Sequence, residues 1–260
     1  MFNFTGKNVV YVGDFNGVGL QVCYAVVQKP IKNLVVCSRT ENVEVLKKIQ
    51  SLNSTVKVTF VQANVADRTS VDHAVKEIVQ AVGHVDVLVN GTSVLADKDV
   101  DTTVAVNLTG VINTTLGLLP FMDKTQSGQG GVVVNVASVY GLEPGPAFSV
   151  YTAAKHGVVG FARSMANEAL YKKTGVAFVC ICPGLTTAEV MVNKRDQNNW
   201  LKWVPHTDDL WNAVTQSKTQ TPEECAVNVV NVMDQMKNGG IYICQQGNVK
   251  EVVPTVYCTI

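Results

Sequence analysis

The chain alternates short, almost continuous apolar segments with longer segments in which apolar residues recur every three or four positions. The short segments are rich in valine, which is typical of strands buried on both faces of a parallel sheet. They predict seven strands, at residues 8–12, 33–37, 57–62, 85–90, 132–137, 176–181 and 241–245. The longer segments predict helices over 17–29, 41–52, 69–82, 100–123, 150–173 and 222–237.

This alternation of strand and helix predicts an α/β fold. The expected architecture is a Rossmann-like, doubly wound parallel sheet of about seven strands with helices on both faces. The last predicted helix has its own start signal, Thr221-Pro222-Glu223-Glu224, in which an N-cap precedes a proline and two acids. Asn238-Gly239-Gly240 is the matching stop. Because no repeat or linker is visible, we expect one domain over 1–260, with an irregular segment at about 186–220 and a tail over 248–260.

Composition narrows the class of protein. Hydrophobic residues make up 47% of the 260 residues and charged residues 16%, so the chain lacks the polar composition of a disordered protein. Lys and Arg number 21 and Asp and Glu also 21, and no basic stripe is visible, so no nucleic-acid partner is expected. A net charge of zero gives little protection against self-association, and a homo-oligomer is therefore expected.

The seven cysteines are an odd number and form no CxxC motif. Most lie inside apolar segments, as Cys180 and Cys182 do, which favours buried, reduced thiols and a cytoplasmic location. We expect no metal site. The first residues lack the features of a secretory signal. No run of about 18 apolar residues is present, and we expect no membrane-spanning segment.

A glycine-rich segment follows the first predicted strand. Gly13 ends that strand, and Gly17-Val18-Gly19 opens the next predicted helix. Glycine lets a ligand approach the backbone closely, and the start of a helix presents free N–H groups to phosphate. After the first strand of a βαβ pattern, this segment favours a site for the pyrophosphate of a dinucleotide. A strand-to-helix turn without a ligand can have the same glycines.

The end of the second strand governs which dinucleotide binds. In such folds an acid about 20 residues past the glycines binds the ribose 2′-hydroxyl of NAD, whereas a nearby arginine accepts the 2′-phosphate of NADP. Ser38 and Arg39 stand there, and the missing acid favours NADP. Asp14 in the glycine loop, with the non-basic Asn16 near it, favours NAD. The choice between NAD and NADP stays open.

Tyr151 and Lys155 lie one helical turn apart on the same face of a predicted helix. A neighbouring cation favours the phenolate, so the pKa of Tyr151 is predicted to fall from its usual value near 10. That would make Tyr151 a general acid/base. A tyrosine and a lysine on an exposed helix face can have the same spacing.

Ser138 favours the catalytic interpretation of this pair, because it follows the fifth strand at the edge where α/β sheets bind ligands. The alternative is a turn serine.

Asn107 lies inside the predicted helix 100–123, in a segment that reads Ala-Val-Asn-Leu-Thr-Gly. A buried polar residue in mid-helix needs a partner. A break in the helix or a water at that point could link Asn107 to Lys155. A core asparagine with its hydrogen bonds satisfied is the equal alternative.

Taken together, these residues resemble the short-chain dehydrogenase/reductase family over nearly the whole chain. The matching positions, in order, are Gly13/Gly17/Gly19, Asn64-Val65, Asn90-Gly91, Asn107, Ser138, Tyr151-x-x-x-Lys155 and Pro183-Gly184. Residues 105–110 look like the insect-type alcohol dehydrogenases, and residues 140–144 and 182–186 look like the related fat-body proteins of flies.

The resemblance implies an NAD(P)-dependent oxidoreductase that moves a hydride between the cofactor and a small alcohol or ketone, with a secondary alcohol expected. Tyr151 would be the acid/base, and Ser138 would hold the substrate oxygen. Lys155 would bind the nicotinamide ribose and lower the tyrosine pKa. Asn107 would anchor a relay water. The cofactor-binding residues would be Gly13, Gly17, Val18, Gly19, Ser38, Arg39, Asn64, Val65, Asn90, Gly91, Lys155, Pro183, Gly184 and Thr186.

The resemblance also implies a homodimer formed through helices 100–123 and 150–173, to which an apolar tail at 252–257 could add. Residues from about 186 to 215, within the irregular segment 186–220, would form a substrate lid. Three departures from the family pattern concern the cofactor site, namely Thr92-Ser93 in place of Ala-Gly, Ser38 in place of an acid, and Asn64 in place of the usual Asp. They leave a second hypothesis open, a non-catalytic fat-body-type protein that binds a cofactor or ligand without turnover.

Overall fold

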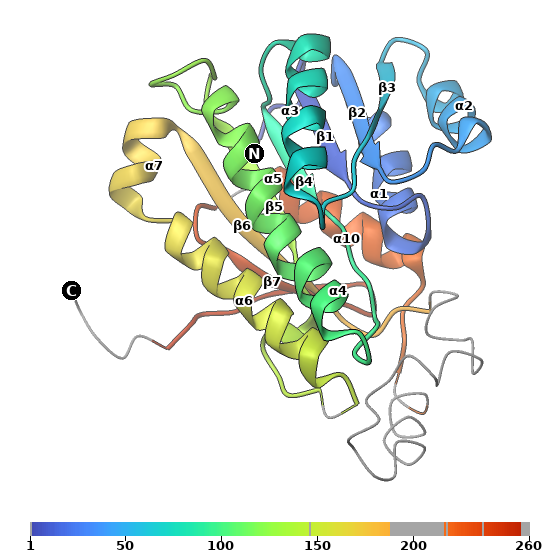
Figure 1. The fold of residues 1–260 in the computed structure, drawn as a ribbon, viewed down its shortest axis with the longest axis vertical. Helices are drawn as coiled ribbons and strands as arrows, with labels where there is room; N and C mark the ends of the chain where they lie inside the picture. Colours follow the sequence, from blue (N-terminus) through green and yellow to red (C-terminus); the bar gives the residue numbers. More distant parts are fainter. Residues whose placement is uncertain (1, 146, 188–215, 217, 236, 256–260) are drawn as a thin grey trace.

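Eight described strands form one sheet in the computed structural model, in the order β3-β2-β1-β4-β5-β6-β7-β8 (Figure 1). The structure describes residues 2–145, 147–187, 216, 218–235 and 237–255. The strands are β1 (Asn8–Val12), β2 (Asn33–Ser38), β3 (Lys57–Gln62), β4 (Val87–Asn90), β5 (Gly131–Val136), β6 (Val176–Pro183), β7 (Ile241–Gln245) and β8 (Asn248–Glu251). The first seven are parallel, and β8 pairs antiparallel with β7. The predicted doubly wound α/β fold is confirmed.

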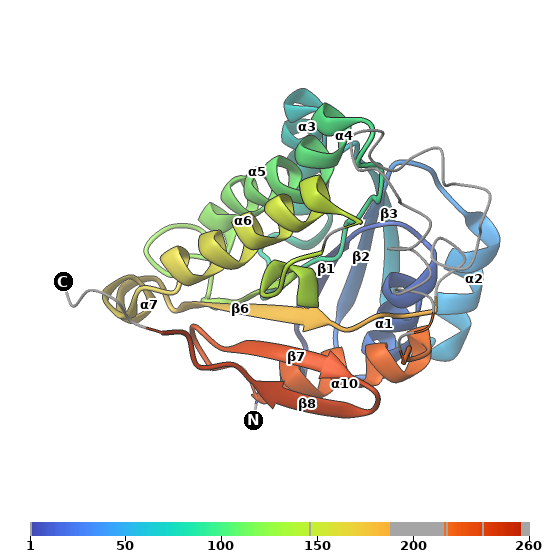
Figure 2. The same cartoon turned by 90° about the horizontal axis from the view of Figure 1, so that it is seen from below.

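Helices cover both faces of this sheet (Figures 1 and 2). On one face lie α1 (Gly17–Val27), α2 (Val43–Leu52) and α10 (Pro222–Gln235). On the other lie α3 (Arg68–Val82), α4 (Val100–Val104), α5 (Gly110–Leu118) and α6 (Ser149–Met165), and α7 (Glu168–Thr174) follows α6. The side chains of β1 point alternately to the two faces of the sheet, and apolar residues on both faces need helices to cover them. Val9 and Tyr11 belong to the apolar cluster under α1 and α10, whereas Val10 and Val12 belong to the cluster under α3.

Two predicted helices are interrupted. The segment 100–123 is α-helical in α4, becomes a π-helix η1 (Ala105–Thr109), resumes as α5 and ends in a 3₁₀ turn η2 (Leu119–Phe121). The segment 150–173 divides into α6 and α7 because Asn167 caps a new helix, its side chain accepting from the N–H groups of Ala169 and Leu170. The predicted cap of α10 is confirmed as a reciprocal capping box, in which Thr221 and Glu224 exchange backbone-to-side-chain hydrogen bonds of 2.9 and 3.2 Å.

The eighth strand lies where the sequence analysis predicted a tail. β8 is exposed along its whole length, so it lacks the apolar pattern that marks the other strands. A two-residue turn joins β7 to β8, and both Gln246 and Gly247 have positive φ, at 51° and 74°. This is the hairpin geometry that a glycine favours at such a turn. The Gln-Gly pair was therefore the one sequence signal for this strand.

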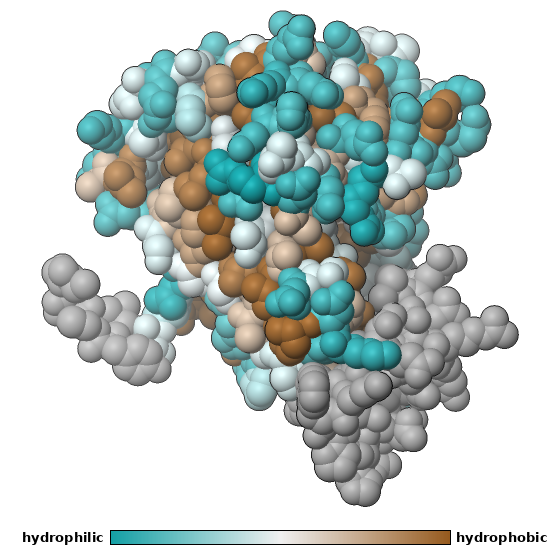
Figure 3. All heavy atoms as spheres, viewed as in Figure 1, coloured by the Kyte–Doolittle hydropathy of each residue, from teal (hydrophilic) through white to brown (hydrophobic). Residues whose placement is uncertain are grey.

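The run Val100–Phe121 is long and apolar enough to cross a membrane by length and composition, although the sequence analysis expected no such segment. This finding is weak, since core helices pass the same test. Of an 18-residue apolar window within this run, 33% is buried. Apolar residues gather along α5 and α6 on the face shown in Figure 3, and Val100 and Leu116 are 44% and 45% exposed. This helical run thus carries more apolar surface than the fold itself covers.

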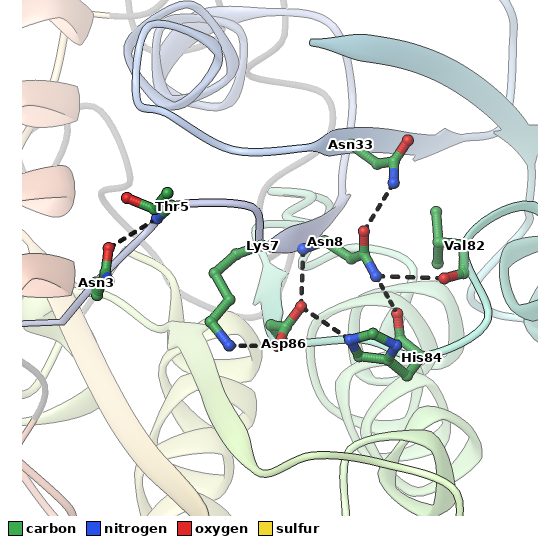
Figure 4. A network of polar contacts seen from close by, with 8 residues as sticks. All are labelled: Asn3, Thr5, Lys7, Asn8, Asn33, Val82, His84 and Asp86. Carbon is green, nitrogen blue, oxygen red and sulfur yellow. Dashed lines mark hydrogen bonds and ion pairs between the residues drawn. The ribbon is translucent and has the colours of Figure 1, made fainter.

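A polar network ties the amino ends of the central strands together, at the edge opposite the candidate site (Figure 4). Asp86 is 1% exposed and accepts hydrogen bonds from the Lys7 ammonium and the backbone N–H of Asn8, both at 2.8 Å. The Asn8 side chain donates to the carbonyls of Val82 and His84 and accepts from Asn33 at 2.7 Å. Asp86 therefore satisfies groups that would otherwise be left unpaired at the start of the sheet.

We predict that Asp86→Ala lowers the free energy of unfolding by about 2–3 kcal/mol. The reason is that the backbone N–H of Asn8 and the ammonium of Lys7 both lose the charged acceptor to which they donate in the unsubstituted protein. Urea titration of the whole chain measures the change. Lys7→Met is the control and should cost less, since the Lys7 side chain is already 31% exposed and the aspartate keeps its bond to Asn8. Equal stability of Asp86→Ala and the unsubstituted protein would contradict this account of the network.

Candidate active site

The sequence-predicted site residues come together at the carboxyl edge of the sheet. The parallel strands all end at this edge, so the glycine loop after β1, Ser38 and Arg39 after β2, and the residues after β3–β6 become neighbours. The segment after β5 carries Ser138, and α6 brings Tyr151 and Lys155 to the same place. One hollow is lined by Gly13, Asp14, Cys37, Ser38, Arg39, Ala63, Asn64, Val65, Thr92, Ser93, Val94, Thr102 and Val106. This hollow spans the ends of β1 to β4.

The ring of Tyr11 lies beneath the glycine loop. A Cβ built on Gly13, Gly19 or Gly91 would collide with the Tyr11 ring, so all three glycines let the backbone close around this side chain. Gly17, the first residue of α1, has a φ of +47°, which also favours glycine. Burial raises the pKa of Tyr11 well above its ordinary value. The glycine pattern thus has a packing cause as well as the ligand-binding cause inferred from the sequence.

The start of α1 suits an anionic ligand. Its N-cap, Asn16, makes no side-chain capping bond, and no acid stands in the first turn of α1. The free N–H groups of that turn, with the positive end of the helix dipole, therefore stay available to phosphate oxygens. Val18 is half-buried within this turn.

The residues after β3 and β4 have divided roles. Asn64 and Val65 line the hollow, and Val65 also packs against Gly110 of α5. The side chain of Asn90 is buried and bonds to Thr114, Thr115 and Asn135 at 2.8–2.9 Å, away from the hollow. Asn90 was predicted to bind the cofactor, and this geometry leaves only its backbone for that purpose.

The two residues that follow Asn90 are held to β1. The backbone N–H of Gly91 and the hydroxyl of Thr92 both bond to the carbonyl of Val12, at 2.8 and 3.2 Å. The turn after β4 is therefore fixed against β1, where it closes one side of the hollow.

Ser138 is buried and caps the 3₁₀ turn η3 (Val139–Gly141). Its Oγ accepts from the N–H of Tyr140 at 3.2 Å, which is the turn-serine role. Because that bond uses only a lone pair, the Ser138 hydroxyl still has its proton to donate. Ser138 also hydrogen-bonds the phenol of Tyr151. The turn-serine interpretation is therefore confirmed, and the contact of Ser138 with a substrate oxygen stays a prediction.

Tyr151 lies in the first turn of α6, among the aromatic and apolar side chains of Phe148, Ala147, Leu95 and Tyr140. Burial raises its pKa above the ordinary value, while hydrogen bonds from the Ser93 and Ser138 hydroxyls lower it. The predicted fall in the Tyr151 pKa is therefore wrong for the chain by itself, because the loss of water around the phenol outweighs the lowering influences.

Lys155 is 1% exposed, and its ammonium lies 5.5 Å from the centre of the Tyr151 ring. The Nζ donates to the backbone carbonyls of Val136 and Thr92 at 3.2 and 3.5 Å. Burial lowers the pKa of Lys155 to about 8. The predicted pairing of this lysine with Tyr151 is confirmed, and the exposed-helix alternative is excluded.

Asn107 lies in the π-helix η1 and is 0% exposed. Its amide forms a two-way link with the backbone of Val94, accepting from its N–H at 3.0 Å and donating to its carbonyl at 2.7 Å. A further bond of 2.8 Å goes to the carbonyl of Thr103. The side chain is thus fully used in holding the segment that follows β4. The helix break expected at this point is present, and the relay water stays a prediction.

Pro183 ends β6, and the backbone N–H of the next residue, Gly184, donates to the carbonyl of Cys244. The Thr186 hydroxyl donates to the carbonyl of Gly184 at 3.0 Å and accepts from Gln220 at 3.3 Å. Gln220 is 1% exposed and also donates to the carbonyl of Cys244 at 2.8 Å. Gln220 therefore links the two ends of the predicted lid, at Thr186 and at Gln220 itself, to β7. Residues 188–215 and 217 of the predicted lid, which spans about 186–220, lie outside the described residues.

Asp97 caps α6, the helix that carries Tyr151 and Lys155, from a distant part of the chain. Its carboxylate is buried and accepts from the backbone N–H groups of Val150 and Tyr151 at 2.8 and 3.0 Å. The adjacent N-cap residue, Phe148, makes no side-chain capping bond to α6. Burial raises the pKa of Asp97, although both backbone bonds lower it. Asp97 is a positioning residue, because it fixes the turn that carries the Tyr151 phenol.

We predict that Asp97→Ala lowers kcat by about 10–100-fold and leaves cofactor affinity within about threefold, because a small displacement of an acid/base is costly. Steady-state kinetics and a binding titration measure both quantities. Asp99→Ala is the matched control, since Asp99 caps α4 through Thr102 at 3.0 Å and should change kcat little.

A pH profile separates this role from a general loss of structure. Protonation of Asp97 removes an acceptor, so kcat should fall as the pH drops through the raised pKa of Asp97. Asp97→Asn keeps one acceptor and should lack this acid limb. An unchanged acid limb in Asp97→Asn would contradict the assignment.

Sequence reasoning missed Tyr11, Asp97 and Gln220. Tyr11 sits in an apolar strand and reads as core. Asp97 and Gln220 act on groups 24–54 residues away in the chain, and no local pattern marks such contacts. Ser93 was noted only as a departure from a family pattern, and its hydrogen bond to Tyr151 depends on the fold.

The six cysteines that the structure describes are free and buried. Burial raises the pKa of Cys23 and Cys37, which leaves both thiols protonated. Cys258 lies outside the described residues. Within the described residues, no group of three or more His, Cys, Asp or Glu side chains is placed to hold a metal ion.

Comparisons with known proteins agree on the family. A family model described as short chain dehydrogenase matches residues 7–199. A development-specific 25 kDa protein of Sarcophaga peregrina is 63% identical over 257 residues, which cover 99% of each chain. Fat body protein 2 of Drosophila melanogaster is 49% identical, again over 99% of each chain. Alcohol dehydrogenase 1 of Ceratitis capitata is 38% identical over 98% of each chain.

Solved structures agree on the fold. Levodione reductase superposes with a TM-score of 0.76 at 23% identity, covering 94% of this chain and 97% of that one. A short chain dehydrogenase/reductase from Burkholderia phymatum in complex with NAD also has a TM-score of 0.76, at 21% identity, covering 94% and 90%.

Proposed function

This chain belongs to the short-chain dehydrogenase/reductase family, and on that premise we propose that it is an oxidoreductase that uses NAD(P) to interconvert a small alcohol and its carbonyl compound. One observation carries the proposal. The hydroxyl of Ser138, the phenol of Tyr151 and the buried ammonium of Lys155 meet at the carboxyl edge of the sheet. The alcohol dehydrogenases among the relatives support the substrate class.

The residues present fit a nicotinamide dinucleotide. The free first turn of α1 suits the pyrophosphate, and the hollow after β1 to β4 suits the adenosine half. The backbones of Gly91 and Gly184, with the Thr186 hydroxyl, would line the nicotinamide half. When bound, the nicotinamide supplies the hydride-accepting or hydride-donating carbon. Every other part of the chemistry falls to side chains of this chain.

Tyr151 would move the proton. In reduction its phenol donates a proton to the substrate carbonyl oxygen, and in oxidation its phenolate takes the hydroxyl proton. The raised pKa of Tyr151 keeps the phenol protonated at neutral pH, which suits the reduction direction. The Ser138 hydroxyl hydrogen-bonds the phenol in this structure, and with substrate present its proton would instead be donated to the substrate oxygen, holding that oxygen beside the phenol.

Lys155 would supply the positive charge. Its ammonium has two backbone partners and one further proton that can be donated to a ribose hydroxyl. A cation at this place also favours the phenolate that oxidation requires. Asn107 would act by holding Val94 in place, and a relay water anchored at the π-helix is part of the proposal.

A second hollow, lined partly by Tyr140, Leu142, Leu185 and Ile243, lies beside the turn that Ser138 caps. Glu143, Lys218, Gln245 and Gln246 also line this hollow, so its lining is mixed. Its apolar side chains support a small substrate with alkyl groups on both sides of the carbon that reacts. A secondary alcohol is such a substrate, and this is the substrate class we propose.

The test is a fluorescence titration with NADH and NADPH, followed by turnover assays over primary alcohols, secondary alcohols and larger sterol- or fatty-type carbonyl compounds. The proposal expects binding of at least one cofactor and turnover that is fastest with secondary alcohols or their ketones. Failure of both cofactors to bind would contradict it.

The alternative function is a fat-body-type protein that binds a cofactor or ligand without turnover. Two relatives of high identity carry names that state no activity, and this observation favours the alternative. Tight NADH binding with no turnover across the whole panel would favour it over the enzyme.

We further propose a homodimer that buries the exposed apolar surface of α4 to α6, where Val100 and Leu116 lie. Sedimentation analysis of the protein and of Leu116→Glu tests this. The free, buried thiols of the described cysteines support a reducing, cytoplasmic location.

A further inference from the structure

The acid missing from the end of β2 has a counterpart one strand away. Asp14 follows Gly13 at the end of β1, and its side chain reaches the residues at the end of β2. One carboxylate oxygen accepts from the Ser38 hydroxyl at 3.3 Å, and the other pairs with the Arg39 guanidinium at 3.3 Å. Ser38 is buried, so its hydrogen bond holds the Asp14 carboxylate from the side of the protein interior.

Asp14 faces the hollow that suits the adenosine half of a dinucleotide. Among the described residues that line this hollow, Asp14 is the one acid and Arg39 the one base. The Asp14 side chain is 30% exposed, so its carboxylate is only partly covered. Each oxygen accepts one hydrogen bond within the protein and retains lone pairs for a further donor.

These groups discriminate between the two dinucleotides. A ribose 2′-hydroxyl can donate to the carboxylate, whereas a 2′-phosphate brings negative charge against it. The ion pair also occupies Arg39, the group that would otherwise attract that phosphate. We propose that Asp14 is the ribose-recognising acid of this chain, supplied by the glycine loop instead of the end of β2, and that it selects NAD over NADP. This inference rests on the proposed function, because it concerns that same cofactor site.

The test measures the dissociation constants of NADH and NADPH by isothermal titration calorimetry on the whole chain. The unsubstituted protein should bind NADH at least about tenfold more tightly than NADPH. Asp14→Asn keeps the size of the side chain and removes its charge. NADH should therefore bind more weakly, and NADPH should bind more tightly because Arg39 no longer pairs with a carboxylate. The ratio of the two dissociation constants should change about 10–100-fold toward NADPH.

Two further variants sharpen the result. Asp14→Asn combined with Ser38→Asp returns an acid to the end of β2 and should restore the preference for NADH. Asp72→Asn removes the acid of a similar exposed pair, in which Asp72 bonds to Arg68 at 2.9 Å on α3, and should leave the ratio unchanged.

The outcomes are separable. A protein that binds NADPH as tightly as NADH, or an Asp14→Asn ratio equal to the unsubstituted one, overturns the role of Asp14. Failure to bind either cofactor overturns the proposed function together with this inference. Binding with the expected ratios supports Asp14 even where no alcohol is turned over, since the readout is affinity.

Discussion

Replacement of Tyr151 by phenylalanine is expected to lower kcat by about 10³-fold or more and to change NADH affinity by less than about threefold. A positioned acid/base contributes roughly 10²–10⁴-fold to a rate, and a thousandfold loss corresponds to about 4 kcal/mol of the barrier. The ring of the phenylalanine can still pack against Phe148 and Leu95, so the fold should be kept. Steady-state kinetics over a range of pH and a titration with NADH measure the two effects.

Tyr171→Phe is the control for this variant. Tyr171 lies on α7 and is 37% exposed, and its hydroxyl is also removed. Turnover of Tyr171→Phe should remain within about threefold of the unsubstituted protein. Retained turnover in Tyr151→Phe would remove the phenol from the mechanism.

Replacement of Lys155 by methionine should have the second-largest effect, on both binding and turnover. Loss of the buried ammonium should weaken the binding of NADH by about tenfold and lower kcat by at least about a hundredfold. The reason is that Lys155 is placed both to donate to the ribose and to favour the phenolate of Tyr151. Lys172→Met is the control, since the Lys172 side chain on α7 is 74% exposed and pairs only with Glu168.

The same lysine predicts a pH dependence. The pKa of Lys155 is about 8, so its ammonium is mostly charged at pH 7 and mostly neutral at pH 9. NADH affinity should therefore fall as the pH rises through about 8, and Lys155→Met should show a flatter dependence. An equal alkaline fall in Lys155→Met would assign this limb to another group.

The fold could be predicted from the sequence because buried parallel strands leave an unmistakable apolar pattern. Val87, Leu88 and Val89 in β4 are all fully buried, and buried runs of this kind also occur in β1, β2, β5 and β6. The edge strand β3 has only Val61 buried, although its apolar residues still marked it in the sequence. The pattern fails where burial is absent. β8 is fully exposed, and the break between α6 and α7 depends on one capping asparagine within an otherwise continuous helical segment.

The sequence predicted where the site residues come together, but it did not correctly predict the direction of the Tyr151 pKa shift. Ser138, Tyr151 and Lys155 come together because parallel strands end at one edge and because a helical turn aligns residues four apart. The direction of the Tyr151 pKa was wrong because it depends on how completely α6 and its neighbours exclude water, which no spacing records. The side chain of Asn90 likewise turns toward Thr114 and Thr115, a choice that α5 imposes.

Hydride transfer itself is the most direct test of the account. The protein is incubated with oxidised NAD and a secondary alcohol that carries deuterium on the carbon bearing the hydroxyl, and the reduced cofactor is analysed by mass spectrometry. The account predicts reduced NAD that carries one deuterium, and almost none with Tyr151→Phe. Bound NAD that gains no deuterium from any alcohol of the panel would contradict the account and leave a binding protein on a dehydrogenase fold.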